Sequence, residues 1–276
     1  MDGRTESIIE MDMRPRQDSV GKRTLVIADE KDIEKKKLIG EGCFGSVYEG
    51  SLTNSGKTEK VAIKCIKAND LTSLTAKNFT REATFLASCN HPNLIPITGI
   101  HLTPVSFWII MPLEKKGSLL NHLLLTKKSI NSGDKSAYPE LRLNLIYYIY
   151  QIADGMAYLH DKDPPLIHRD LACRNILLGA NDVVKISDFG LVRNVNDLND
   201  KVGERLPIKW LALESLKTFK FNQKTDVWSF GVTVWEILTL GNSPFKNVEL
   251  DTNKIVELLE SGSRLRKYKI KIFSSR

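Results

Sequence analysis

The chain has 276 residues, of which 42% are hydrophobic and 26% are charged, and this composition excludes a disordered chain, a collagen and a disulfide-rich scaffold. The formal net charge is +7, but residues 264–276 hold six basic side chains and no acidic one, so that the rest of the chain is near +1. The basic character therefore belongs to a terminal tail. We expect no nucleic-acid partner.

The four cysteines are scattered along the chain, at Cys43, Cys65, Cys89 and Cys173. Their spacing excludes a CxxC metal or redox motif and fits a reducing compartment. The N-terminal residues carry acids where a signal peptide has its apolar core, and the densest apolar run, 104–113, is far shorter than the ~20 residues of a membrane span. We expect a cytoplasmic chain.

The first part of the chain is typical of short strands and glycine turns. Residues 1–32 are polar and predict a flexible lead-in, juxtamembrane-like in position, with one short strand at 25–27. Beyond Lys37, strands are predicted at 46–48, 61–66 and 107–111, and a helix at about 76–88.

After Gly117 the pattern is helical. One apolar face recurs at steps of three and four residues, at Leu145, Ile149, Ile152, Met156 and Leu159. A hairpin is predicted over 176–186, and residues 226–240 are apolar on nearly every side, which predicts a buried helix. Residues 127–138 are polar and predict a surface insert. Strands first and helices second predict an α+β protein of two lobes, with a seam near 112–117.

A GxGxxG run covers six residues, Gly40, Glu41, Gly42, Cys43, Phe44 and Gly45. Glycine allows a backbone to approach phosphates closely. In a dinucleotide fold a helix would follow the third glycine, whereas here the strand-like Ser46–Tyr48 follows. The run favours a phosphate-covering hairpin over a dehydrogenase motif. Taken alone, it also fits a plain glycine-rich hairpin.

Two charged residues are candidates for a functional pair. Lys64 lies in a strand in which Ala62, Lys64 and Ile66 share one face, and Glu82 lies in the predicted helix. Taken singly, each also fits a solvated surface charge. Paired, Glu82 would orient the Lys64 ammonium towards bound phosphates.

Two segments carry the strongest signal, Ile167–Asn175 and Ser187–Gly190, on either side of the predicted hairpin. They bring two carboxylates and an amide to the ends of short strands. Asp188 and Asn175 can each hold a metal ion, and Asp170 can accept the proton of an attacking hydroxyl. Either motif alone could arise by chance, but the pair with this spacing indicates phosphoryl transfer.

These motifs, in this order, resemble those of protein kinases from about residue 33 to residue 262. Ala172 and Arg174 after Asp170, with Leu206–Trp210, resemble the tyrosine-kinase pattern. Residues 210–216 and the hinge residues Met111–Glu114 are similar to receptor tyrosine kinases, the Axl-like group being one candidate. The resemblance implies a bilobal protein kinase fold. Its β-rich small lobe would span 33–111, its hinge 112–117, its α-helical large lobe 118–262 and its basic tail 263–276, all within a kinase domain of residues 33–276.

The resemblance also implies the cofactors, ATP and Mg²⁺, and protein substrates that carry tyrosine. Catalytic roles would fall to Asp170, Lys64, Glu82, Arg174, Asn175 and Asp188, with Asn175 and Asp188 as metal ligands. The nucleotide would contact the six residues of the glycine run and Val47, Ala62, Lys64, Met111, Pro112, Glu114 and Leu177. The adenine would bond to the carbonyl of Pro112 and the N–H of Glu114, and Pro112 can serve because only its carbonyl is needed.

The chain departs from the family in two places. Residues 191–210 contain no Ser, Thr or Tyr, so that Asp197, Asp200 or Glu204 would have to supply the anion that phosphorylation provides in relatives; the alternative is a solvated acidic loop. The chain also has fewer residues after 262 than the family, which implies a C-terminally truncated large lobe without its last helices, and Glu214 without an arginine partner.

Two functions follow from the resemblance. The first is a protein tyrosine kinase in signalling. The alternative is a catalytically impaired kinase-fold module that binds ATP or acts as a scaffold. If the chain derives from a receptor, it would meet the membrane only through a segment absent from it, as the intracellular part of a plasma-membrane receptor, and dimerisation would be expected.

Overall fold

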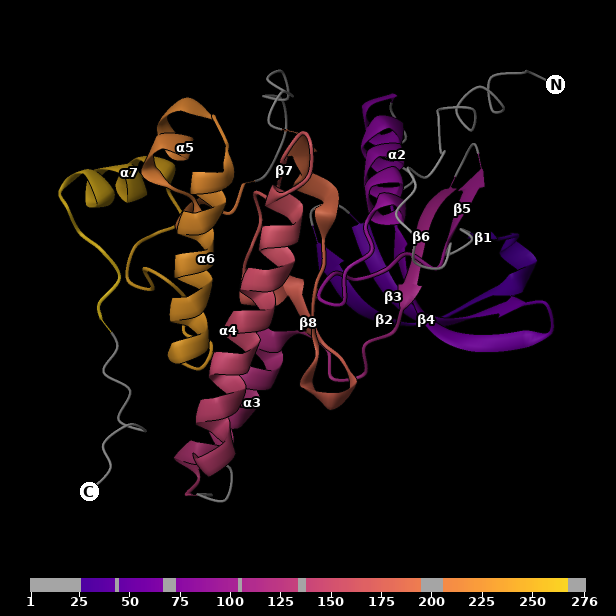
Figure 1. Cartoon of the computed structure of the whole chain (residues 1–276), viewed down its shortest axis with the longest axis horizontal. Coiled ribbons are helices and arrows are strands. Elements are labelled where there is room, and N and C mark those ends of the chain that lie inside the picture. The colour runs from indigo at the N-terminus through magenta and orange to yellow at the C-terminus, as the bar shows by residue number, and fades with distance from the viewer. Residues whose placement is uncertain are drawn as a thin grey trace. The chain divides into compact units, whose positions relative to one another are not determined.

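The computed structural model describes residues 26–42, 45–66, 73–103, 106–133, 138–194 and 206–267. The chain forms two compact units. The first unit takes the residues up to Asn90 and Ile95–Leu113, and the second takes His91–Leu94 and the residues from Glu114 onwards. The β-rich first unit and the helical second unit confirm the predicted α+β class (Figure 1).

The first unit is a six-stranded sheet with one α-helix, drawn in indigo to magenta in Figure 1. Its strands are β1 (Val26–Ile27), β2 (Ile33–Gly42), β3 (Gly45–Asn54), β4 (Lys57–Cys65), β5 (Gly99–Thr103) and β6 (Ser106–Pro112), in the order β1-β5-β6-β4-β3-β2. A 3₁₀ turn, η1 (Glu30–Asp32), precedes β2, and the helix is α2 (Ser73–Ser88). The pair β1–β5 is parallel and the other pairs are antiparallel.

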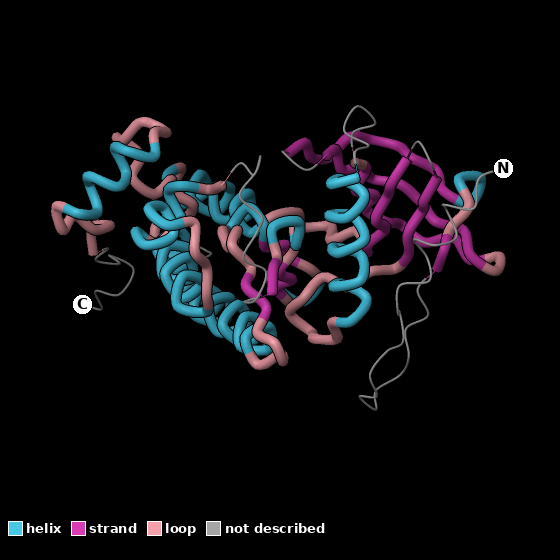
Figure 2. Tube along the Cα trace, turned by 90° about the horizontal axis from the view of Figure 1, so that it is seen from above, coloured by secondary structure: helices cyan, strands magenta, loops and turns pink. Residues whose placement is uncertain are grey.

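The two faces of this sheet differ in what they bury. One face carries Val61 and Ile63, both fully buried in the core of the unit together with Trp108 and other apolar side chains. The opposite face meets α2, because the Phe79 ring stacks on Phe107 at 5.2 Å between centroids. Figure 2 shows the helix beside the strands of the sheet.

The folded unit begins earlier than predicted. Val26–Ile27 is the expected short strand, but it pairs with β5, and Ala28 behind it is buried. Residues 26–32 are therefore part of the first unit and do not belong to a flexible lead-in. Gly99 allows this pairing, because a Cβ there would lie 2.7 Å from the carbonyl oxygen of Val26. Residues 1–25 lie outside the described residues.

The second unit consists mainly of helices. They are α3 (Leu119–Asn131), α4 (Tyr138–His160), α5 (Leu213–Thr218), α6 (Gln223–Leu238) and α7 (Thr252–Glu260). Two short hairpin-like pairs join β7 (Leu166–Ile167) to β10 (Arg193–Asn194) and β8 (Ile176–Leu178) to β9 (Val184–Ile186). Four 3₁₀ turns lie between α4 and α5 in the chain, η3 (Cys173–Asn175), η4 (Ala180–Asp182), η5 (Phe189–Leu191) and η6 (Ile208–Trp210).

The central helices of this unit confirm most of the predicted pattern. On α4, Leu145, Ile152 and Leu159 are almost completely buried, as the spacing predicts. Helix α6 begins at Gln223, where Asn222 and Thr225 form a reciprocal capping box. The predicted buried helix is confirmed in large part, since Val232 and Ile237 of α6 are buried, but Val227 is 61% exposed.

The predicted surface insert over 127–138 was also wrong in its first half. Residues 127–131 complete α3, whose buried Leu119 and Leu123 anchor it. A helix that exposes its last turns needs no apolar residues there, and the sequence pattern therefore missed them. Residues 134–137 lie outside the described part of the chain.

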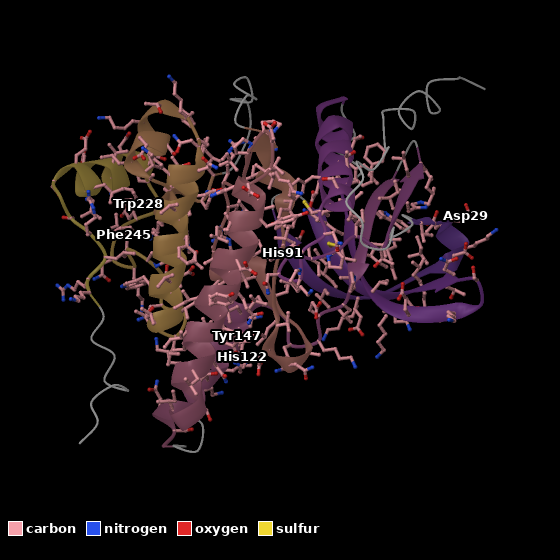
Figure 3. All side chains as sticks on the ribbon, viewed as in Figure 1. Asp29, His91, His122, Tyr147, Trp228 and Phe245 are labelled. Atoms are coloured by element: carbon pink, nitrogen blue, oxygen red, sulfur yellow. The ribbon has the colours of Figure 1, made fainter. Side chains whose placement is uncertain are left out.

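A second apolar cluster joins α5, α6 and α7. Its buried members are Leu211, Leu216, Ile255 and Leu259, and Trp228 and Phe245 pack against them (Figure 3). Within the described parts of the chain, no helix combines the length and the apolar character that crossing a membrane requires.

Candidate active site

The glycine run lies in the predicted hairpin. Gly42 at the end of β2 pairs with Gly45 at the start of β3, and Cys43 and Phe44 lie outside the described residues. Gly45 has φ +138°, and a Cβ there would lie only 2.1 Å from the carbonyl oxygen of Cys65. Glycine is therefore required here for the start of β3 to pass so close to β4.

Lys64 and Glu82 form the predicted pair within the first unit. The Lys64 Nζ donates to Glu82 Oε1 at 2.7 Å, and the two residues are only 7% and 5% exposed. Burial excludes the alternative of two solvated surface charges. A buried ammonium and carboxylate are stable only when each is paired, so that α2 fixes the position of the β4 lysine.

The register of the sheet brings four of the predicted nucleotide contacts of the first unit to one face. Gly40 pairs with Val47, Val47 pairs with Lys64, and Ala62 pairs with Met111. Cross-strand partners share a face, and so do residues two apart on a strand. Val47, Ala62, Lys64 and Met111 thus share the face that α2 meets, whereas Pro112 pairs with Val61 on the core face.

The start of the second unit holds the other two predicted nucleotide contacts. Glu114 begins a tight turn in which the Gly117 N–H donates to its carbonyl at 3.1 Å, and its carboxylate lies against Gly179. Burial raises the pKa of Glu114. Leu177 is half-buried on β8, between the fully buried Ile176 and Leu178.

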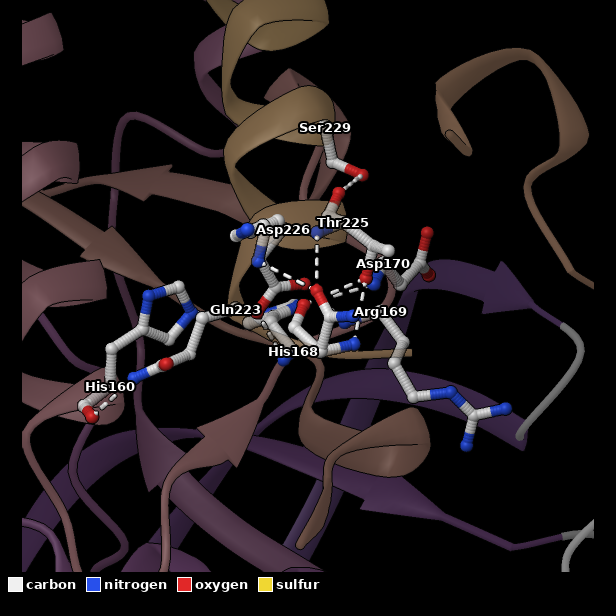
Figure 4. A network of polar contacts seen from close by, with 10 residues as sticks. His160, His168, Arg169, Asp170, Gln223, Thr225, Asp226 and Ser229 are labelled. Carbon is white, nitrogen blue, oxygen red and sulfur yellow. Dashed lines mark hydrogen bonds and ion pairs between the residues drawn. The ribbon is translucent and has the colours of Figure 1, made fainter. Parts of the chain in front are cut away.

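A buried carboxylate on α6 holds the segment around Asp170 (Figure 4). Asp226, 1% exposed, accepts the backbone N–H of His168 at 2.7 Å and that of Arg169 at 3.0 Å, and it also contacts His160 Nε2 at 3.0 Å. Sequence reasoning missed this role. The available signal was an acid at the start of a helix that is otherwise almost wholly apolar.

Asp170 is the buried acid at the centre of this segment. It is 7% exposed, its N–H donates to His168 Nδ1 at 3.2 Å, and its carboxylate is ion-paired with Arg174. Burial raises the pKa of Asp170 to about 6, an effect that Arg174 opposes and Asp188 reinforces. Burial also lowers the pKa of His168, whose ring is therefore neutral at pH 7. Asp170 is thus ionised at neutral pH and can accept a proton.

Asn175 and Asp188 lie on loops that hydrogen bonds join directly. The carbonyl of Asn175 accepts both the N–H and the hydroxyl of Ser187 at 2.8 Å. Asp188 follows with φ +63°, a left-handed conformation that is costly for a residue other than glycine and often marks a functional site. Phe189 is buried beside His168, with ring centroids 5.3 Å apart.

The donor chemistry of these two residues fits Mg²⁺. The Asn175 amide nitrogen donates to the Asp170 carbonyl at 2.8 Å, which leaves its amide oxygen as the group for a cation, and Asp188 offers a carboxylate. Among the described residues no group of three or more His, Cys, Asp or Glu side chains could hold a metal ion. Mg²⁺ is commonly bound by one or two protein oxygens together with substrate phosphates, and this pair matches that need.

The expected departures from the family concern three acidic residues of segment 191–210 and Glu214. Asp197, Asp200 and Glu204 lie outside the described residues. Glu214 is solvent-exposed in the first turn of α5.

Comparison with known proteins identifies a family. The model of the family "Protein tyrosine and serine/threonine kinase" matches residues 33–272. The epidermal growth factor receptor of Apis mellifera is 39% identical over 87% of this chain, the tyrosine-protein kinase Abl of Drosophila melanogaster 38% over 85%, and the tyrosine-protein kinase receptor TYRO3 of Gallus gallus 35% over 87%. The chain spans 18%, 14% and 28% of the length of these relatives, respectively. The chain therefore belongs to the protein tyrosine and serine/threonine kinase family.

Proposed function

We propose that the chain is a protein tyrosine kinase, which transfers the γ-phosphoryl group of ATP to tyrosine hydroxyls of protein substrates. The observation that carries the proposal is the buried Asp170 carboxylate, with Arg174 paired to it and with Asn175 and Asp188 on adjoining loops. A proton acceptor beside two magnesium-type ligands serves phosphoryl transfer to a hydroxyl group.

Each residue of the second unit has a distinct part in this proposal. Asp170 orients the tyrosine hydroxyl and accepts its proton, while Arg174 holds the Asp170 carboxylate in place. Asn175 and Asp188 would hold Mg²⁺, whose positive charge would offset the negative charge on the phosphoryl group that ATP donates. The protein otherwise contributes position and electrostatics.

The first unit would supply the remaining contacts to the nucleotide. Lys64, oriented by Glu82, binds the phosphates, and the backbone N–H groups of residues 40–45 cover them. Within this unit, Val47, Ala62 and Met111 would contact the adenine, and the Pro112 carbonyl would accept a hydrogen bond from its edge. The shared face of Val47, Ala62, Lys64 and Met111 supports this assignment.

The choice of tyrosine over serine or threonine rests on Ala172 and Arg174, as in the tyrosine-kinase pattern, and on the names of the relatives. Because two of the three relatives are named as receptors, we extend the proposal to the cytoplasmic kinase part of a membrane receptor, with dimerisation as its mode of assembly. The Axl-like subfamily stays a prediction.

Transfer of labelled phosphate from ATP to poly(Glu,Tyr), with a serine/threonine substrate in parallel, tests the proposal. We expect tyrosine labelling only. Asp170→Asn should lower it by at least about a hundredfold, because general-base catalysis contributes about 10²–10⁴. Mg-ATP should still raise the melting temperature of this variant. The exposed Asp161→Asn is the matched control, and wild-type transfer by Asp170→Asn would refute the role of Asp170.

The same two measurements test the alternative of an ATP-binding module. A rise in melting temperature with Mg-ATP, without transfer to either substrate, would favour that alternative. If Mg-ATP does not raise the melting temperature and no phosphate is transferred, both functions are rejected.

A further inference from the structure

We propose that Glu236 is a positioning residue for Asp170, acting through Trp210 and Arg174. The inference rests on the proposed kinase function and concerns only residues of the second unit. Sequence reasoning did not single out Glu236, which lies in the apolar helix α6.

The first step concerns Arg174, which lies between Asp170 and an aromatic ring. Its guanidinium pairs with the Asp170 carboxylate, and its central carbon lies 4.5 Å from the centroid of the Trp210 ring. The Arg174 side chain is 36% exposed, so that water competes for it. Stacking on an indole restrains a planar guanidinium that would otherwise sample several rotamers. The Trp210 ring is therefore one wall of the position from which Arg174 reaches Asp170.

The second step concerns what holds the Trp210 ring. Its Nε1–H donates to Glu236 Oε2 at 2.8 Å. The Trp210 carbonyl in turn accepts the hydroxyl of Ser229 at 2.9 Å, also on α6. Trp210 is thus held both at its backbone carbonyl and at its indole nitrogen. Its ring cannot rotate away from Arg174 without breaking the hydrogen bond to the Glu236 carboxylate.

The third step concerns the same carboxylate oxygen. Glu236 Oε2 also accepts the backbone N–H of Cys173 at 3.1 Å, and Cys173 directly precedes Arg174. Glu236 is 2% exposed, and burial raises its pKa. One buried oxygen therefore joins the backbone that carries Arg174 to the ring on which Arg174 stacks, and it sets the spacing of the two.

A purely structural role for Glu236 would predict a different result, and two tryptophans distinguish the roles. Trp210→Phe keeps a ring under Arg174 but removes the N–H that Glu236 holds. Trp228→Phe is the matched control, since Trp228 lies on α6 and packs against the apolar cluster beside it, and its Nε1 is buried without a hydrogen-bond partner among the described residues. Kinetics at saturating Mg-ATP and thermal melting are measured for both variants.

We expect Trp210→Phe to lower kcat for poly(Glu,Tyr) about tenfold, because the loss of the hydrogen bond from the ring to Glu236 leaves Arg174 less firmly positioned at Asp170. KM for ATP should stay within about twofold. Trp228→Phe should leave kcat unchanged. An unchanged kcat in Trp210→Phe, or an equal fall of kcat in both variants, would overturn the proposal.

Substitution of Glu236 itself adds a rescue test. Glu236→Ala removes the acceptor, whereas Glu236→Gln keeps one amide oxygen that can accept both N–H groups. We expect Glu236→Gln to recover most of the kcat lost in Glu236→Ala. Equal kcat in the two variants would contradict a role for the accepting oxygen.

One further readout does not depend on catalysis and separates this inference from the proposed function. In wild-type protein the Arg174 Nε–H resonance should exchange slowly with water, and in Trp210→Phe it should exchange at least about tenfold faster. Unchanged exchange in Trp210→Phe would overturn the positioning role. Faster exchange, in a chain that transfers no phosphate, would reject the kinase function while the positioning contact stands.

Discussion

Each unit of the molecule contains one ion pair between a basic residue and a candidate site acid, and the two pairs differ in exposure. Lys64 and Glu82 are both withdrawn from water, with side chains only 8% and 6% exposed. In the pair of Arg174 and Asp170, the acid is 10% exposed but the arginine is 36% exposed. The first pair is therefore part of the core, whereas the second can respond to solvent and substrate.

This difference has a physical consequence for what each pair can do. A fully buried pair is expensive to break and holds its geometry, which suits the orientation of phosphates by an ammonium group. A half-exposed arginine screens the acid only in part, so that burial still raises the pKa of Asp170 to about 6. A carboxylate of that pKa is ionised at pH 7, yet basic enough to receive a proton.

The largest effect is expected from breaking the buried pair. Glu82→Ala should lower the free energy of unfolding, measured with urea, by about 3–5 kcal/mol, because it removes the carboxylate that compensates the Lys64 ammonium. The matched control is Glu260→Ala, which breaks an exposed pair with Lys217 and should lower the free energy of unfolding by less than about 1 kcal/mol. Similar losses in the two variants would contradict a difference based on burial.

The pH dependence of transfer should report the Asp170 carboxylate. Its pKa of about 6 in the folded chain lies above the ordinary 3.8, so that activity needs the ionised form and falls as pH drops through 6. Well below pH 6, kcat/KM for poly(Glu,Tyr) should decrease about tenfold per pH unit, which gives a fall of about fiftyfold from pH 6 to pH 4.

The Asp170 carboxylate affects stability with the opposite pH dependence, because its contribution to the free energy of unfolding decreases as pH rises. Because the pKa is raised on folding, its contribution is fully present below the unfolded value of 3.8 and is lost as pH rises through about 6. A kcat/KM that stays flat down to pH 4, in a chain that melting curves show to be folded, would rule out Asp170 as the proton acceptor.

Removal of Arg174 should have a smaller effect, on activity more than on stability. Arg174→Ala should cost no more than about 1 kcal/mol in unfolding free energy, because its charge is partly solvated. It should lower kcat about tenfold through loss of a charge-assisted bond to Asp170. Arg174 lowers the pKa of Asp170, so that in Arg174→Ala the fall of kcat/KM at acidic pH should begin at a higher pH than in the wild-type chain. A fall that begins at a lower pH would contradict this electrostatic coupling.

Sequence reasoning reached the local structure of both units but not all of their tertiary contacts. Alternation predicted the strand of Lys64, and periodicity predicted the buried face of α4, because both patterns follow from the local backbone. The pairing of Lys64 with Glu82, 18 residues apart in sequence, was a candidate that the residues alone did not separate from two solvated surface charges. Asp226 and Glu236 stand out in the sequence only as two acids in a largely apolar helix, and such acids do not reveal which backbone N–H groups they will meet.

The smallest effect is expected at an exposed pair of the second unit. Lys116 Nζ lies 2.6 Å from Asp182 Oδ1, but the side chains are 43% and 35% exposed. Lys116→Met should therefore lower the free energy of unfolding by less than about 1 kcal/mol, and 1 M salt, with a Debye length of about 3 Å, should remove most of the difference. Urea titrations of both chains at low and high salt measure this. A loss of 3 kcal/mol that persists in 1 M salt would show that close approach of two charges, rather than their burial, decides the strength of a pair in this protein.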